Sequence, residues 1–402
     1  MAPWQGFPPR VRSVELSLAE TGFFQQMETK IQNIVFWQNI LSIHQSAFVR
    51  ALADWPGIRV TFAYEEDLPE SRKAMGWTIP NYGAAQLVDV RDQVQWNRLV
   101  ALNDLDTCHV FGSYFRLPRA YAAFRHLRHA PCRRAWTTEA FDYYGWRGWL
   151  RLQRARWHVY REARAAFHRV FAMGDLGVKF FRRVGVHPEQ LREFAYLVEP
   201  PISTPPPPEP DRAVAGCRFL FVGQLIHRKG VDLLLRAVSR LPESGWSLDL
   251  IGDGADRESL QAFVVAHGLS GSVRFCGNQP NAVVLAALQS ADVLILPSRW
   301  DGWGAVVNEA LMLGTPVIVS DACGAASLIV NNACGTVFRR ADHKDLYQAL
   351  QAVLDRGTIA ISQRVELRTW AQQTLGGLSL SRYFFESFSI NATDLALPPW
   401  KA

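Results

Sequence analysis

The chain has 402 residues, of which 49% are hydrophobic and 20% charged, and its formal net charge is +6. This length favours two domains, and the composition indicates a globular protein with apolar residues for two cores. No apolar run reaches membrane-spanning length, and the first ten residues lack the apolar region of a signal peptide. Six cysteines without close paired spacing predict reduced residues, with no zinc or disulfide framework.

The N-terminal part of the chain alternates predicted strands with predicted helices, after a peripheral N-terminal extension at residues 1–30. Strands are predicted at 33–37, 57–62, 84–90, 107–111, 134–138 and 169–173, and helices at 43–55, at 92–102 and between the later strands. Alternation of this kind predicts βαβ units and a parallel sheet. We therefore expect a Rossmann-like domain over residues 31–200.

The segment Phe111–Val186 is strongly basic, with 16 Lys and Arg against 4 Asp and Glu. Such a field attracts the phosphates of a soluble ligand, a lipid head group or nucleic acid. Within it, Tyr143–Trp157 interleaves aromatic and basic residues. This pattern favours contact of the 143–169 region with an anionic membrane surface, or else an ordinary amphipathic helix with its tryptophans in the core. No recognised nucleic-acid module accompanies it, so nucleic acid is not an expected partner.

A proline-rich stretch divides the chain, with seven prolines between Glu199 and Asp211. It predicts a semi-rigid linker over 201–214. The alternation then restarts. Strands are predicted at 217–222, 247–251, 273–276, 291–296, 317–319 and 335–338. A second Rossmann-like domain is expected over 215–360, and helices over 361–402 are expected to cross back to the first domain. The predicted fold class is α/β, with two doubly wound domains facing each other across a cleft.

The stretch Ser298–Ile318 connects a predicted buried strand to a helix expected at 305–313. A strand end, a glycine-bearing loop and a helix N-terminus present backbone N–H groups and a positive dipole end, which predicts an anion site. Asp301 and Glu309 flank this loop, and ionised carboxylates accept hydrogen bonds from hydroxyl groups. An anion site between two such acids would suit a ligand with phosphate in its middle and hydroxyl groups at both ends, and a nucleotide-sugar is such a ligand. A surface loop with solvated acids is the alternative.

Three other turns follow predicted strands. In the first, Gly223 allows a close turn, and Arg228 and Lys229 supply cations that would stabilise a diphosphate leaving group. The turn at 251–254 is glycine-rich but lacks the third glycine of a dinucleotide fingerprint. The turn at 275–280 would offer groups to a base. A solvated basic turn and plain strand-to-helix turns are the alternatives.

An ordered set of motifs spans residues 217 to 340. The motifs are Gly223-x-Leu225-x3-Lys229-Gly230-Val-Asp232, Gly252-Asp-Gly254, Phe275-x-Gly277, the strand Ala291–Ser298, Asp301-Gly-x-Gly304-x4-Glu309-Ala310 and Gly314-Thr-Pro-Val-Ile318. As a set they resemble the nucleotide-binding domain of the retaining family 4 glycosyltransferases, which have the GT-B architecture. The donor-binding residues predicted from turns and resemblance are Gly223, Gln224, Arg228, Lys229, Gly252, Gly254, Asn278, Asp301, Gly302, Trp303, Gly304 and Glu309.

The resemblance implies a role for each matching residue. Glu309 would hold the ribose hydroxyls, Asp301 would contact donor-sugar hydroxyls, and Lys229 would bind the diphosphate. Residues 302–304 would present backbone N–H groups to the sugar and the distal phosphate. The chain departs from the family twice, because Asp301 stands where Glu is usual and Gln224 where Arg is usual. The first change shortens the reach towards the sugar. For the second, either Arg228 would compensate or the phosphates would be bound less tightly.

The first half resembles the family only in layout. The usual Gly-Gly loop is replaced by Gln38–Gln45, in which His44 would either contact acceptor or phosphate or merely cap and pack. Glu139 and Asp142 follow a predicted strand where family members often place a histidine. Either carboxylate would orient or deprotonate an acceptor hydroxyl, and Glu139 is favoured as a catalytic residue beside Asp301, Glu309 and Lys229.

The sequence therefore predicts a retaining, metal-independent hexosyltransferase without a cofactor. Its donor would be a nucleotide-diphosphate sugar, a UDP- or GDP-sugar rather than an ADP-sugar. The acceptor would be a saccharide or a lipid-linked molecule in polysaccharide, lipopolysaccharide or glycolipid synthesis. The expected location is the cytoplasm, including a peripheral position on the inner face of the membrane. The rival hypotheses are a nucleotide-sugar epimerase of the same fold and a non-catalytic nucleotide-binding scaffold protein.

Overall fold

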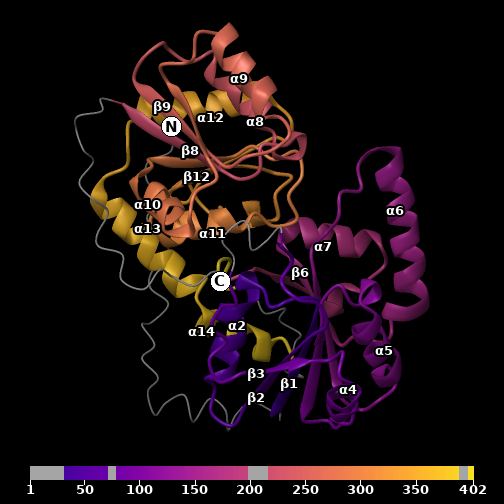
Figure 1. Cartoon of the computed structure of the whole chain (residues 1–402). Helices are drawn as coiled ribbons and strands as arrows, with labels where there is room; N and C mark the ends of the chain where they lie inside the picture. Colours follow the sequence, from indigo (N-terminus) through magenta and orange to yellow (C-terminus); the bar gives the residue numbers. More distant parts are fainter. Residues whose placement is uncertain (1–30, 71–77, 198–215, 389–396) are drawn as a thin grey trace. The chain divides into compact units, whose positions relative to one another are not determined.

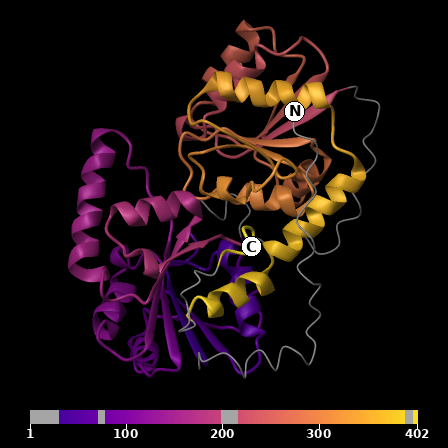
Figure 2. The ribbon, with the colours of Figure 1, turned by 180° about the vertical axis from the view of Figure 1, so that it is seen from behind.

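The computed structural model describes residues 31–70, 78–197, 216–388 and 397–402, which form two compact units (Figures 1 and 2). One unit holds the described residues up to 197 together with those from Leu375 onward, and the other runs from 216 to Thr374. The predicted N-terminal extension and proline-rich linker lie outside the described residues. Among the described residues, no helix is both long enough and apolar enough to cross a membrane.

The N-terminal unit contains a seven-stranded parallel sheet in the order β3-β2-β1-β4-β5-β6-β7. Its strands are β1 (Asn33–Gln38), β2 (Arg59–Tyr64), β3 (Gln86–Asp89), β4 (Thr107–Phe111), β5 (Arg133–Thr138), β6 (Arg169–Met173) and β7 (Leu191–Phe194). The first six confirm the sequence prediction. The sequence does not predict β7, because the charged Arg192 and Glu193 interrupt its apolar pattern.

Helices cover both faces of this sheet, with α2 and α14 on one side and α4 and α5 on the other (Figures 1 and 2). The helices are α2 (Ile43–Ala53), α4 (Gln93–Val100), α5 (Pro118–Leu127), α6 (Gly145–His158), α7 (Gly174–Arg183) and α14 (Gly377–Glu386), with short turns η1 (Tyr114–Arg116), η2 (Val159–Ala163) and η3 (Pro188–Gln190). The chain's last long helix, α14, packs against α2, where the Phe48 and Phe384 rings lie 5.7 Å apart.

The C-terminal unit contains a six-stranded parallel sheet in the order β10-β9-β8-β11-β12-β13. Its strands are β8 (Cys217–Val222), β9 (Trp246–Ile251), β10 (Val273–Gly277), β11 (Val293–Leu296), β12 (Val317–Ser320) and β13 (Gly335–Phe338). All six confirm the sequence prediction. The strand order reverses between β8 and β11, and ligands of open α/β sheets bind beyond the carboxyl ends of the strands at such a reversal.

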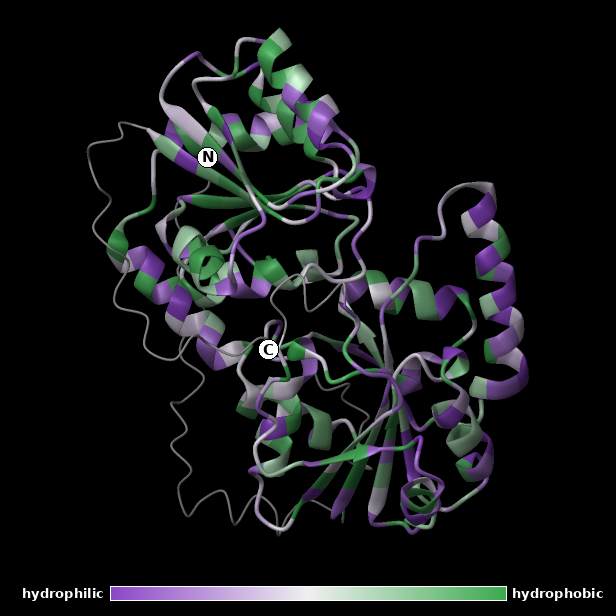
Figure 3. Ribbon diagram, in the orientation of Figure 1, coloured by the Kyte–Doolittle hydropathy of each residue, from purple (hydrophilic) through white to green (hydrophobic). Residues whose placement is uncertain are grey.

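Helices again cover both faces, with α8, α9 and α12 on one side and α10, α11 and α13 on the other (Figures 1 and 2). The helices are α8 (Val231–Val238), α9 (Arg257–Ala266), α10 (Asn281–Ser290), α11 (Ala305–Met312), α12 (His343–Arg356) and α13 (Ile361–Thr374), with short turns η4 (His227–Lys229) and η5 (Gly324–Leu328). Figure 3 shows mostly hydrophobic colours on the central strands of the C-terminal sheet and a mixture of colours on the strands of the N-terminal sheet. Apolar central strands are expected where a parallel sheet is buried on both faces.

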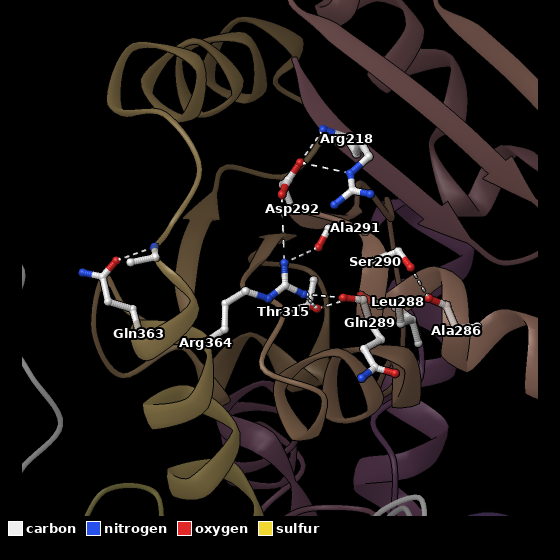
Figure 4. A network of polar contacts seen from close by, with 11 residues as sticks. Arg218, Ala286, Leu288, Gln289, Ser290, Ala291, Asp292, Thr315, Gln363 and Arg364 are labelled. Carbon is white, nitrogen blue, oxygen red and sulfur yellow. Dashed lines mark hydrogen bonds and ion pairs between the residues drawn. The ribbon is translucent and has the colours of Figure 1, made fainter. Parts of the chain in front are cut away.

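A buried arginine anchors α13 to this unit (Figure 4). The Arg364 guanidinium donates to the carbonyl oxygens of Gln289 and Ala291 at 2.6 and 2.8 Å, and to the Thr315 hydroxyl at 2.8 Å. Asp292 lies 4.0 Å from it and accepts from the Arg218 backbone N–H. Because these partners flank the start of β11, the network holds the strand that leads into the 298–304 loop.

Candidate functional site

The loops after β8 and β11 lie side by side at the strand reversal, and Arg299 joins them. Its guanidinium donates to both carboxylate oxygens of Asp232, at 2.6 and 2.7 Å, and to the His227 carbonyl at 2.8 Å. The Arg299 backbone N–H donates to the Arg228 carbonyl. A bidentate arginine–carboxylate pair is among the stronger surface contacts. The sequence analysis includes Asp232 in the first motif but gives neither Asp232 nor Arg299 a role, because nothing local shows that they pair.

Three predicted site residues meet at this junction. The Lys229 ammonium lies 2.5 Å from Oδ2 of Asp301, and the Arg228 guanidinium lies 3.7 Å from Oδ1. Arg228 also donates to the Trp300 carbonyl at 3.0 Å. Asp301 is buried, so its charge requires such partners. The structure therefore gathers the acid expected to face a sugar and the cations expected to face a diphosphate into one cluster.

Glu309 is the fifth residue of α11 and lies partly buried. Burial raises the pKa of its carboxyl from 4.5 to about 7. Among the described residues, its carboxylate has neither a hydrogen-bond donor nor an ion-pair partner. A desolvated carboxylate without donors is well suited to accept hydrogen bonds from ligand hydroxyl groups.

The loop between β11 and α11 is held by the loop after β12. The Asp301 backbone N–H donates to the Ala322 carbonyl, Gly324 donates to the Asp301 carbonyl, and Ala325 donates to the Trp303 carbonyl, at 2.8–3.1 Å. Gly324 fits closely there, since a Cβ on it would lie 2.3 Å from the Gly302 carbonyl oxygen. Sequence reasoning missed this second loop, whose glycine is its main signal.

Gly304 begins α11 with φ 94°, a left-handed conformation that favours glycine. A Cβ there would lie 2.6 Å from the Cys323 sulfur and 2.8 Å from Leu296. Within the described part of the chain, the backbone N–H groups of Gly302 and Gly304 have no acceptor. They remain donors for an anion at the helix N-terminus. The Trp303 indole is buried and donates to Asn308 at 2.8 Å, so only the backbone of Trp303 can meet a ligand.

The glycines of the other two turns serve packing. A Cβ on Gly252, which has φ 133°, would lie 1.9 Å from the Gly223 carbonyl oxygen, and one on Gly254 would lie 2.3 Å from the Leu225 carbonyl oxygen. The backbones of the turns after β8 and β9 are therefore in direct contact, with no space for a side chain between them. Gln224 is exposed beside them, and Asn278 is exposed after β10, on the far side of β9 from β8. Contact of these residues with a donor stays a prediction.

Ser298, directly after β11 and Pro297, is a further residue that sequence reasoning missed. It is fully buried, and its hydroxyl has no hydrogen-bond partner among the described residues. An unsatisfied buried hydroxyl beside a candidate site marks a place for a ligand or a water. All six cysteines are free thiols in this structure. In the described ranges, no three His, Cys, Asp or Glu side chains are grouped to hold a metal ion.

At the corresponding edge of the N-terminal sheet, Tyr196 contacts two predicted site residues, Glu139 and His44. The Tyr196 hydroxyl hydrogen-bonds to Glu139, and its ring lies 5.9 Å from the His44 ring. Burial and Glu139 together raise the pKa of Tyr196 well above its ordinary value. These rings and Gln38 line a cavity of about 20 Å³, room for about one water molecule. Tyr196 escaped the sequence analysis because it follows the unpredicted β7.

Asp142 does not join that group. Its Oδ1 accepts from the Tyr144 backbone N–H at 3.1 Å, and its carbonyl accepts from Arg151. An aspartate that bonds two residues ahead shapes a local turn, here the one that leads into α6. His44 lies in the first turn of α2, with its N–H bonded to the Ser42 hydroxyl. Of the three predicted acceptor-side residues, the structure connects Glu139 and His44.

Solved structures with the same architecture identify the class of fold. Over 88% of this chain and 99% of its own, the Anabaena protein HepE in complex with UDP superposes with a TM-score of 0.67 at 15% identity. The lipopolysaccharide outer core galactosyltransferase WaaB does so with a TM-score of 0.64 at 16% identity, over 88% and 98%. These likenesses, with two Rossmann-like sheets of the same strand order, show the GT-B fold.

Sequence comparison finds relatives of the C-terminal unit. Residues 216–372 match the family model of the Glycosyl transferases group 1. The glycogen synthase of Mycobacterium tuberculosis is 32% identical over 139 residues, 34% of each chain. The lipopolysaccharide core biosynthesis glycosyltransferase LpsE of Rhizobium meliloti is 30% identical over 158 residues, 39% of this chain and 44% of its own. The chain thus spans about a third to less than half of these curated relatives.

Proposed function

We propose that this chain is a retaining glycosyltransferase that moves a sugar from a nucleotide-diphosphate sugar to a hydroxyl acceptor. The observation that carries the proposal is the Lys229–Asp301 pair, 2.5 Å apart at the strand reversal of the sheet whose residues match the group 1 family. The partner-free carboxylate of Glu309 lies on the helix that follows the same loop. An anion-binding cluster beside an acceptor for hydroxyl hydrogens suits a diphosphate joined to a ribose and a sugar.

The proposed roles follow from charge. Lys229, Arg228 and the start of α11 would neutralise the diphosphate, so the reaction would need no metal. Glu309 would accept from the ribose hydroxyls, and Asp301 would contact the donor sugar. In the step that the family resemblance implies, the acceptor oxygen bonds to the anomeric carbon of the donor sugar. The bond between that carbon and the phosphate oxygen breaks at the same time. The acceptor proton passes to the leaving phosphate oxygen, and the new bond forms on the face that the phosphate vacates.

The comparison with solved structures suggests which donor to test first. HepE has been solved with UDP and with UDP-glucose, so UDP-glucose is the first donor to test here. Asp301, one methylene shorter than the usual Glu, and Gln224 in place of Arg leave the preferred sugar to experiment. For the acceptor, Glu139 would orient a hydroxyl group from the N-terminal unit. A saccharide or lipid-linked acceptor fits a role in polysaccharide, lipopolysaccharide or glycolipid synthesis.

Two rival functions share the nucleotide site. An epimerase of the same fold would convert the donor sugar without an acceptor, and a scaffold protein would bind the nucleotide without transfer. The relatives named above are a synthase and transferases, which favours transfer over both. NMR of the donor incubated without acceptor separates the epimerase, because only an epimerase changes the sugar stereochemistry under those conditions.

The proposal is tested by replacing Glu309 with alanine. We expect transfer from UDP-glucose or GDP-mannose to an acceptor panel to fall by at least about a hundredfold, because two hydrogen bonds to a charged group are lost. Glu258→Ala, which removes an exposed glutamate of α9, is the matched control and should leave transfer unchanged. Circular dichroism checks that both variants fold. Near-normal turnover by Glu309→Ala would sink the assignment.

A further inference from the structure

Helix α6 and the turn η2 that continues it are packed unusually lightly. Gly148 is the only buried residue of α6. Figure 1 shows the helix at the outer edge of the N-terminal unit. Five large apolar or aromatic side chains along it are between 47% and 71% exposed, namely Trp146, Trp149, Leu150, Trp157 and Tyr160. The alternative of an amphipathic helix with its tryptophans in the core is therefore wrong.

These five side chains share one face of the helix. They follow one another at intervals of three, one, seven and three residues, which keeps them within one stripe of an α-helix. The buried Gly148 lies on the opposite side. By the same spacing, Arg147, Arg151 and Arg154 flank the stripe on one side and Arg156 flanks it on the other. An exposed aromatic stripe edged by arginine is the arrangement of helices that lie in a membrane interface.

The charge of this surface is not neutralised within the protein. Residues 143–169 contain seven arginines and one acid, Glu162. Glu162 is engaged elsewhere, because it accepts from the Tyr121 hydroxyl at 2.9 Å and lies 3.8 Å from the His158 ring nitrogen. Among the described residues, no carboxylate forms an ion pair with an arginine of α6 or η2. The stripe therefore carries a strong positive field towards solvent.

A pocket of about 450 Å³ adjoins the stripe. Arg156 and Arg164 line it together with the aromatic rings of Trp157 and Tyr160, and the end of α7 at Val184–Gly185 closes one side. The turn η2, a π-helix, lies at this pocket, and π-helical turns are frequent at functional sites. The Arg164 guanidinium lies over the Tyr160 ring, 6.0 Å from its centre. Two guanidinium groups without ion-pair partners among the described residues, in a pocket that aromatic residues also line, suit a phosphate attached to an apolar or sugar moiety.

We propose that α6 and η2 form a docking surface for an anionic phospholipid bilayer, with a lipid phosphate held between Arg156 and Arg164. The tryptophans and Tyr160 enter the interfacial region, and the flanking arginines face the lipid phosphates. A second copy of the chain is the less favourable occupant, since it would bring two arginine-rich surfaces together. This surface would bring the protein to a membrane-borne acceptor, but the docking itself does not require the transferase activity proposed above.

The test is sedimentation of the whole chain with vesicles of phosphatidylglycerol and phosphatidylcholine, compared with vesicles of phosphatidylcholine alone. We expect binding to the anionic vesicles only, with affinity falling as salt is raised. Trp146→Ser with Trp149→Ser should abolish sedimentation, while Val94→Ser, an equally exposed apolar residue of α4, should leave it unchanged. Equal binding to both vesicle types, or none, would overturn the proposal.

The pocket is tested by two matched pairs of arginines. Each arginine near an anionic surface contributes about fivefold in affinity. Arg147→Ser with Arg154→Ser should lower the affinity for anionic vesicles only by this charge effect. Arg156→Ser with Arg164→Ser should lower it further, because this pair would also lose the contact with the lipid phosphate. Equal losses would remove the phosphate pocket from the proposal. Light scattering in the absence of vesicles checks for self-association, and dimers that the Trp146 and Trp149 changes dissolve would identify a second copy as the occupant instead.

Discussion

The two units share a strand order but differ in what lies at the strand reversal. In the C-terminal unit, the loops beyond β8 and β11 carry the charged Lys229, Asp301 and Arg299, and Arg299 pairs with Asp232 at the start of α8. In the N-terminal unit, the edge at β1 and β4 carries Gln38, whose amide covers Gly112, beside His44 and Tyr196. One fold therefore presents a cluster of cations and acids in one unit and, in the other, the carboxylate of Glu139 among neutral polar groups.

The difference teaches how the fold divides two kinds of binding. A diphosphate requires fixed cations and aligned N–H groups, such as Lys229 and the start of α11. An uncharged hydroxyl requires neutral donors and acceptors of exact direction. Charge alone thus assigns the donor to the C-terminal unit in our proposal, and variants that alter one kind of group should affect one substrate and spare the other.

Lys229→Met should have the largest effect. It removes the cation expected to stabilise the leaving diphosphate and leaves Asp301 buried with only the more distant Arg228, so we expect a loss of about a thousandfold in kcat/KM. Calorimetry should show weaker UDP binding, and the KM of the acceptor should not change. Lys344→Met, an exposed lysine of α12, is the control. A change confined to acceptor KM would contradict the division between the units.

Glu309→Gln should alter stability with pH. Burial raises the pKa of Glu309 from 4.5 to about 7, so the folded chain holds this proton more tightly than the unfolded chain. Ionisation therefore destabilises the fold progressively as pH rises from about 4.5 to about 7. The variant, which cannot ionise, should be more stable by up to about 3 kcal/mol above pH 7 and equal to the parent below pH 4.5.

Urea unfolding of both proteins at the two ends of that pH range measures the difference, with Glu258→Gln as the exposed control. The same variant should lose nucleotide affinity, since the neutral amide accepts hydroxyl hydrogens less strongly than a carboxylate. A variant that is more stable but binds its ligand less tightly indicates that the replaced residue serves function at the expense of stability. A stability difference that is the same at all pH values would show that Glu309 is not held at the raised pKa.

The sequence predicts the sheets better than the site. Buried parallel strands such as Val293–Leu296 are apolar throughout and bounded by turns, so they are visible locally. The motif from Asp301 to Glu309 is contiguous for the same reason. The Arg299–Asp232 pair and the hydrogen bonds between the 301–303 loop and Ala322 and Ala325 connect distant segments, and only the fold brings them together. Tyr196 shows the same limit in the N-terminal unit, where no motif led to it.

Tyr196→Phe tests the neutral side of the comparison and should have the smallest effect. Because its pKa is raised well above the ordinary value, the Tyr196 hydroxyl stays protonated and donates to Glu139 at any working pH. The variant keeps the ring beside His44 but frees Glu139 from its donor. We expect a loss of about tenfold in kcat/KM for the acceptor, mostly in KM, because one hydrogen bond to a charged group contributes about 1.5 kcal/mol.

Nucleotide affinity measured by calorimetry should be unchanged in Tyr196→Phe, since UDP is assigned to the other unit. Tyr347→Phe is the matched control, because its hydroxyl donates to Gln351 on α12 of the C-terminal unit and serves no proposed substrate. A purely structural role for Tyr196 would lower the unfolding midpoint and leave KM alone. Equal losses of acceptor and UDP affinity would instead mean that both substrates depend on the Glu139–Tyr196 pair, and the ionic and neutral edges would no longer be separate sites.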